Sequence, residues 1–103
     1  MSRVILEPKF DGETKTYEFD FAADLATAET ISTQNVTATV YSGTDASPSN
    51  LLSGSTTASG TVVSQNITGG TVGVIYKLLC NITTSAGQTL ERSGYLAVIP
   101  DLP

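Results

Sequence analysis

The sequence predicts an all-β sandwich that folds as a single domain over residues 1–103. Apolar and polar residues alternate with a period of two in several segments, which is the period of a half-buried strand. The polar residues are rich in β-branched threonine, which suits a sheet surface facing water, and clusters of Gly, Ser, Asn and Pro separate the alternating segments. A chain of 103 residues supplies one core, and no helix longer than a turn or two is expected.

The first half of the chain contains three predicted strands. A short strand is expected at Val4–Glu7, and a second at Lys15–Phe21, where three aromatic residues share one face. These aromatic residues are Tyr17, Phe19 and Phe21. The third predicted strand is Val36–Tyr41, and residues 22–33 are expected to connect the two sheets with a short turn of helix at most.

The middle of the chain is rich in turn signals. Ser42–Thr57 contains Ser-Gly, Ser-Pro-Ser-Asn and Ser-Gly-Ser-Thr-Thr, so we expect a long loop there. Leu51 and Leu52 are its large apolar residues and are expected to hold a short edge strand against the core. A further strand is predicted at Thr61–Thr68, before Gly69-Gly70. Its expected core residues are Val63 and Ile67.

The last third predicts a hairpin. Ile75–Thr83 alternates clearly, and a final strand is expected over Gln88–Ile99. Ser-Ala-Gly between them predicts a tight reversal in which Gly87 adopts a positive φ. The residues expected to face the core are Tyr76, Leu78, Cys80, Ile82, Leu90, Leu96 and Val98. The total is about seven short strands, the pattern of an antiparallel β-sandwich.

A local signature makes the fold class more specific. Gly-Gly-Thr-Val-Gly-Val-Ile-Tyr places Tyr76 after a glycine-rich turn, at the start of the penultimate strand. Immunoglobulin-like sandwiches carry a tyrosine corner at this position, where the hydroxyl bonds to backbone a few residues upstream. An ordinary core tyrosine is the alternative, but the hairpin that follows favours the corner. We therefore predict an immunoglobulin-like sandwich.

Charge and composition exclude several classes of function. The net charge is −5, and the five bases are scattered, so neither nucleic acid nor an anionic membrane is an expected partner. No apolar run approaches the length of a membrane span, and the first residues do not resemble a signal peptide, so we expect synthesis in the cytoplasm without export by that route. A single cysteine, Cys80, rules out an intramolecular disulfide.

The sequence offers little for catalysis. There is no histidine, Cys80 lies at an inward position, and neither a zinc motif nor a phosphate-binding loop is present, so we expect no enzyme and no cofactor. Six acids crowd the first third and could act as a carboxylate pair or bind Ca²⁺. A solvated face that protects strand edges is the favoured interpretation. These acids are Asp11, Glu13, Glu18, Asp20, Asp24 and Glu29.

Several segments carry a family resemblance. They are Val-Ile-Leu-Glu-Pro-Lys near the N-terminus, Tyr-Glu-Phe-Asp-Phe followed by Leu25 and Glu-Thr-Ile-Ser, and Thr-Gly-Gly-Thr-Val-Gly-Val-Ile-Tyr-Lys-Leu. The last is Asn-Ile-Thr-Thr-Ser-Ala-Gly-Gln-Thr-Leu-Glu-Arg-Ser-Gly-Tyr-Leu-Ala-Val. Together they make the chain similar to the fibre–tail adaptor proteins of tailed bacteriophages, from about Val4 to Val98. Val36–Thr57 departs from the family pattern, and Asp20-Phe21 stands where relatives often carry Asp-Trp.

The resemblance implies a non-enzymatic virion protein at the tail or neck. Its partners would be other virion proteins, such as a tail fibre or an adaptor ring, and copies of itself in a symmetric assembly. Loops on a rigid sandwich are the usual binding elements, so contacts are expected on residues 43–57 and at both termini. Exposed tyrosine is favoured at interfaces. The predicted contact residues are Arg3, Phe10, Tyr41, Ser47, Pro48, Leu51, Tyr95 and Leu102.

Three other functions remain open at this point. A head-decoration protein with the same fold differs from a tail adaptor in location and copy number. A receptor- or carbohydrate-binding adhesin module is less favoured, because the chain has no tryptophan. A carboxylate-dependent hydrolase would need its acids in a pocket, whereas the alternation places them on a flat outer face.

Overall fold

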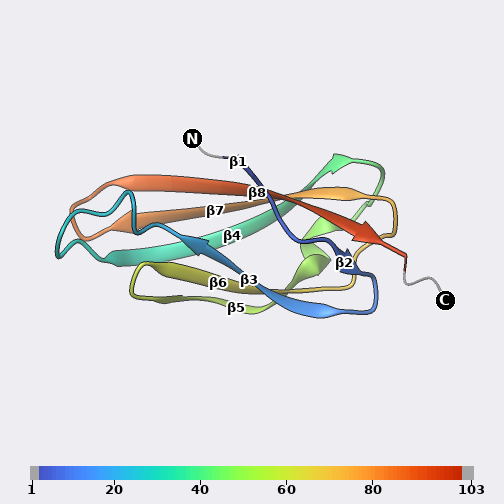
Figure 1. Ribbon diagram of the computed structural model, residues 1–103, viewed down its shortest axis with the longest axis horizontal. Coiled ribbons are helices and arrows are strands. Elements are labelled where there is room, and N and C mark those ends of the chain that lie inside the picture. Colours follow the sequence, from blue (N-terminus) through green and yellow to red (C-terminus); the bar gives the residue numbers. More distant parts are fainter. Residues whose placement is uncertain (1–2, 101–103) are drawn as a thin grey trace.

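The computed structural model describes residues 3–100, with side chains described from Leu6 onward, and shows an all-β sandwich measuring 48 × 20 × 20 Å (Figure 1). One sheet has the strand order β1-β8-β7-β4, with β2 also paired to β8, and the other has the order β3-β6-β5. The strands are β1 (Arg3–Ile5), β2 (Lys9–Phe10), β3 (Thr14–Asp20), β4 (Ile31–Ser42), β5 (Leu52–Ser59), β6 (Val62–Thr68), β7 (Ile75–Thr84) and β8 (Thr89–Ile99). A 3₁₀ helix, η1 (Pro48–Leu51), precedes β5.

The core lies between the two sheets and is built by the alternation that the sequence shows. Every second residue of β7 is buried, and the same alternation buries the aromatic residues of β3. The fully buried residues of β6 and β8 complete this layer. All the core residues predicted from the sequence lie inside it, except that Leu90 is only partly buried.

The pairing is antiparallel apart from the N-terminal segment. β1 and β2 both run parallel to β8, with Val4 opposite Gly94 and Lys9 opposite Val98. The predicted strand at Val4–Glu7 is therefore shifted and divided: the ladder continues through Leu6, whose N–H donates to the Tyr95 carbonyl, and then stops. The stop has a plain cause, because Pro8 has no N–H to donate.

Two further boundaries differ from the prediction. β4 begins at Ile31 rather than Val36. The sequence does not reveal its first half, because the inward position there is the polar Gln34, whose Nε2 lies 3.5 Å from the Thr56 carbonyl, so the apolar alternation is lost. The predicted loop at residues 42–57 instead contains η1 and most of β5, a Ser- and Thr-rich strand without apolar alternation.

The predicted reversal is confirmed, and the predicted connection at residues 22–33 is confirmed over residues 22–30, because residues 31–33 belong to β4. Gly87 has φ 85° between β7 and β8. Residues 22–30 form turns rather than a helix, and the Phe21 carbonyl accepts the N–H groups of Asp24 and Leu25 at 2.9 and 3.1 Å. Within residues 3–100, no helix has the length and apolar character needed to cross a lipid bilayer.

Candidate protein-contact surface

Exposed apolar side chains gather at the end of the sandwich where β8 finishes. Phe10 and Ile99 are register partners in the β2–β8 ladder, and each is 37% exposed. Val72, which is 42% exposed, belongs to the β6–β7 loop, and the next residue, Gly73, donates its N–H to the Val98 carbonyl at 2.9 Å. Figure 1 shows β2, this loop and the end of β8 meeting at the same end of the molecule.

A tyrosine pair lies on the outer face of the larger sheet. The rings of Tyr41 and Tyr95 stack with their centroids 4.5 Å apart and their planes inclined by 27°. Tyr41 belongs to β4 and Tyr95 to β8, so the pair spans the intervening strand β7. Tyr41 is 59% exposed, and Tyr95 is half-buried. Both tyrosines face outward, as expected, and an exposed aromatic pair of this kind suits a protein interface.

The other predicted contact residues have different positions. Ser47 is exposed just before η1, and Pro48 is half-buried at its first position. Leu51 is only 1% exposed and belongs to the core, so it is corrected from a surface contact to a core residue. Arg3 lies in β1 opposite Ser93, and its side chain lies outside what the structure describes. Leu102 also lies outside the described residues.

A buried tyrosine, Tyr76, joins the loop between β4 and η1 to the loop between β6 and β7. The Tyr76 hydroxyl donates to Asp45 Oδ2 at 2.6 Å and accepts the Thr71 N–H at 2.8 Å. This is the predicted tyrosine corner, with backbone five residues upstream as its partner. The Tyr76 hydroxyl, followed by the Ser47 N–H, lowers the pKa of Asp45. Burial, with the Asp45 carboxylate second, raises the pKa of Tyr76 and keeps its hydroxyl protonated. Sequence reasoning found Tyr76 but not Asp45.

A buried lysine holds β2 in place, which sequence reasoning missed. Lys9 is one of the five bases that lie scattered along the sequence, and its side chain is fully buried. Its Nζ donates to the carbonyls of Phe10 at 2.7 Å and Gly69 at 2.5 Å. Burial lowers the Lys9 pKa, and the carboxylates of Glu13 and then Asp11 act in the opposite direction. Lys9 therefore joins the N-terminal segment to the β6–β7 loop. Its burial follows from the pairing of β2 with β8, which no pattern in the sequence predicts.

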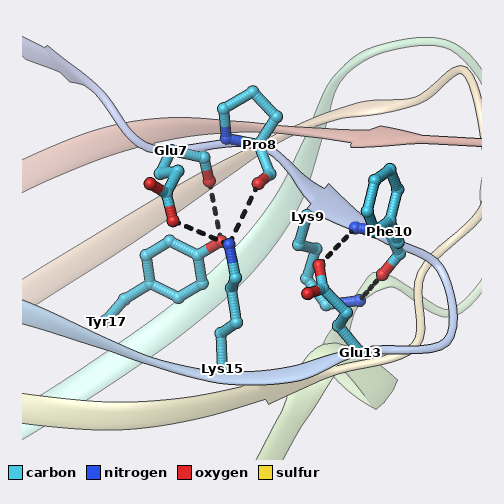
Figure 2. Close-up of polar contacts among 7 residues, drawn as sticks. All are labelled: Glu7, Pro8, Lys9, Phe10, Glu13, Lys15 and Tyr17. Carbon is cyan, nitrogen blue, oxygen red and sulfur yellow. Dashed lines mark hydrogen bonds and ion pairs between the residues drawn. The ribbon is translucent and has the colours of Figure 1, made fainter. Parts of the chain in front are cut away.

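The residues before Lys9 are fastened to β3 (Figure 2). Lys15 Nζ forms an ion pair with Glu7 at 2.7 Å, and the Tyr17 hydroxyl donates to the Glu7 carbonyl at 2.7 Å. The hydrogen bond from Lys15 lowers the pKa of Glu7, and the same bond raises the pKa of Lys15. Figure 2 also shows Glu13 accepting the Phe10 N–H, at 2.7 Å. These contacts fix the backbone that presents Phe10 to solvent.

The acids of the first third take separate positions, some exposed and some paired within the fold. Glu18 and Asp20 are exposed on β3, as expected. Glu29 was expected on the solvated face, but it is buried and accepts the Thr84 hydroxyl at 2.5 Å and the Ala26 N–H at 2.9 Å. These bonds lower its pKa, that from Thr84 most. Asp24 is paired with Arg92 at 2.5 Å. Within the part of the chain described, no three His, Cys, Asp or Glu residues gather to hold a metal ion.

The lone cysteine is a core residue. Cys80 is fully buried as a free thiol, as predicted, and burial raises its pKa to about 12. A thiol with such a pKa holds almost no thiolate at neutral pH, and thiolate is the nucleophilic form. A separate groove of about 440 Å³ lies between the N-terminal segment and β3 and is lined by Leu6, Glu7, Lys15, Thr16, Tyr17 and Glu18. Its lysine is already paired with a carboxylate of the same groove.

A β-sandwich whose loops are joined by buried polar contacts, with exposed apolar side chains gathered at one end, suits a structural role. The chain belongs to a bacteriophage family: residues 9–97 match the family described as Podophage GP4 fiber-tail adaptor protein gp77. This confirms the resemblance seen in the sequence. A search of curated proteins finds no match.

Proposed function

We propose that this chain is a non-enzymatic adaptor at the tail or neck of a tailed-phage virion, where it acts as one domain and docks tail fibres or other tail proteins. The observation that carries this proposal is the family match over residues 9–97. The absence of a catalytic role is supported by the buried, protonated Cys80 and by two acids that are already bound within the fold, Asp24 to Arg92 and Glu29 to Thr84.

The strand arrangement supports classing the sandwich as immunoglobulin-like. Constant-type immunoglobulin domains have strands A, B, E and D in one sheet and C, F and G in the other. Here β3, β6 and β5 occupy the positions of B, E and D, and β4, β7 and β8 those of C, F and G. β1 pairs with the edge of β8. Tyr76, the tyrosine of the corner, lies near the start of β7, which occupies the position of strand F.

The proposed contact surface comprises the tyrosine pair and the end of the sandwich beside it. It includes Tyr41, Tyr95, Phe10, Ser47 and Pro48, together with Arg3 and Leu102 at the termini. The two tyrosines offer a large aromatic area, and the Asp45–Tyr76 bond limits the entropy lost when the loops bind. The proposed partners are virion proteins and further copies of this chain in a symmetric assembly, in which many weak contacts act together. Nucleic acid and membrane are not proposed partners.

The test is a phage that lacks this chain. Particles should assemble tails without fibres and adsorb poorly, and the wild-type chain supplied in trans should restore both properties. Tyr41→Ala should restore them only in part, whereas Thr89→Ala, an exposed change at the opposite end of β8, should restore them fully. Fibre occupancy counted by electron microscopy is the readout. Normal fibres on particles without the chain would refute the proposal.

A further inference from the structure

The sandwich exposes several strand edges, and most of them carry features that discourage further pairing. β3 carries the charged residues Lys15, Glu18 and Asp20. β1 and β2 are three and two residues long, with Pro8 between them. β5 is interrupted by a register shift after Ser53 and by a glycine with φ 72°. Charge, short length, proline and bulges are the usual means by which proteins prevent edge-to-edge association.

The edge of β4 lacks these features. Its pairing with β7 is regular from Thr33 to Val40, and the strand contains neither proline nor a charged residue. From Thr30 to Tyr76 the sequence has a single charge, Asp45, which Tyr76 already binds. Within residues 3–100, β7 is the only strand that pairs with β4. A regular, neutral edge strand is a template for another strand.

We propose that β4 pairs antiparallel with β4 of a second copy of this chain, about a two-fold axis at Thr37. This register places Thr37 opposite its counterpart and Asn35 opposite Thr39, and all three side chains are exposed. The chain already uses both kinds of pair between its own strands. The Thr14 and Thr68 hydroxyls lie 2.8 Å apart, and the Thr16 hydroxyl donates to Asn66 Oδ1 at 2.5 Å. Cross-strand pairs of this kind stabilise antiparallel sheets.

The distribution of charge favours a second copy as the occupant. Each chain carries a net charge of −5, so two copies repel unless they meet where neither presents acids. The exposed acids of β3 lie on the smaller sheet, and β4 forms the far edge of the larger one. The register also sets Val36 opposite Ala38, residues that are buried in each copy. The two larger sheets then become one continuous sheet.

This inference deepens the proposed function by naming a surface for self-assembly, and the purified protein tests it separately. Sedimentation of the wild type over the micromolar to millimolar range should show a concentration-dependent dimer. Thr37→Lys should weaken dimerisation by about tenfold or more, because it places two like charges opposite each other. Thr16→Lys, the same change on the outer face of β3, should leave dimerisation unchanged. A wild type that stays monomeric, or two variants that behave alike, would overturn the proposal.

A disulfide trap tests the register. Thr37→Cys should form a covalent dimer under mild oxidation, because directly opposed Cα atoms lie about 4.5–5.5 Å apart in an antiparallel pair. Thr39→Cys should form it far more slowly, because its counterpart would lie about 13 Å along the strand. Cys80 is buried in both variants and provides no competing thiol. Faster cross-linking at Thr39, or equal rates, would contradict the two-fold axis. If the purified protein neither dimerises nor cross-links at Thr37 but the chain is found on tails, the self-pairing proposal is overturned and the proposed adaptor function is not.

Discussion

Replacing Tyr76 by phenylalanine tests the contact that joins the two loops. The substitution keeps the fully buried ring and removes only the hydroxyl, which bonds to the Thr71 N–H and to Asp45 Oδ2. Each net hydrogen bond contributes about 1 kcal/mol, so we expect Tyr76→Phe to lower the free energy of unfolding by about 2 kcal/mol. For a domain of this size, such a loss lowers Tm by roughly 10 °C.

Urea and thermal unfolding of the wild type and the variant measure this loss. Tyr41→Phe is the matched control, because Tyr41 is 59% exposed, and we expect it to change stability by less than about 0.5 kcal/mol. A Tyr76→Phe effect no larger than that of the control would refute the argument that the hydroxyl holds the loops together.

The effect of Tyr76→Phe should also depend on pH. In the folded protein the Tyr76 hydroxyl holds the pKa of Asp45 below its ordinary value of 3.8. A carboxyl with a lowered folded pKa stabilises the protein above its unfolded pKa, and this stabilisation is lost as pH falls through the folded pKa. The difference in unfolding free energy between wild type and variant should therefore narrow below about pH 4. A constant difference across this range would show that the bond to Asp45 contributes little.

Three further predictions concern the interior. Gly70→Ala should destabilise the fold by about 1–3 kcal/mol in urea unfolding, because φ is 99° and a Cβ would lie 2.7 Å from Val98 Cγ2; Gly69→Ala, with open space around it, should cost less. Gln65→Leu should cost about 2 kcal/mol and speed hydrogen exchange in β5, because the buried amide binds carbonyls at that strand's register shift; unchanged exchange would argue against this role. Cys80 should resist a thiol reagent until urea unfolds the chain, and rapid native labelling would contradict its burial.

The strands with clear alternation were predictable from the sequence because one face of each strand is apolar and the other is more polar. Tyr17 and Phe19 mark the inward face of β3, Phe21 follows directly after it, and the same alternation marks the inward face of β7. β5 and the first half of β4 were hidden because their stability comes from backbone pairing and from inward polar groups, such as Gln34. A strand whose inner face is polar carries no apolar period for sequence reasoning to detect.

The contact surface was only partly predictable for a related reason. The outward tyrosines followed from alternation within their strands, and their stacking depends on the pairing of β4, β7 and β8. Lys9 and Glu29 were misplaced because their burial comes from partners distant in sequence. Lys9 binds the carbonyl of Gly69, and Glu29 binds Thr84. Residue type alone predicts the exposed average for a lysine or a glutamate, and tertiary partners decide the exceptions.

Location in the particle tests the central claim most directly. Purified virions, separated into tails and heads, can be analysed by quantitative mass spectrometry with isotope-labelled peptides of this chain. The adaptor account predicts that the chain travels with the tail fraction, at a copy number that is a multiple of the tail's symmetry. Recovery with heads at capsid-like abundance, or absence from both fractions, would contradict it.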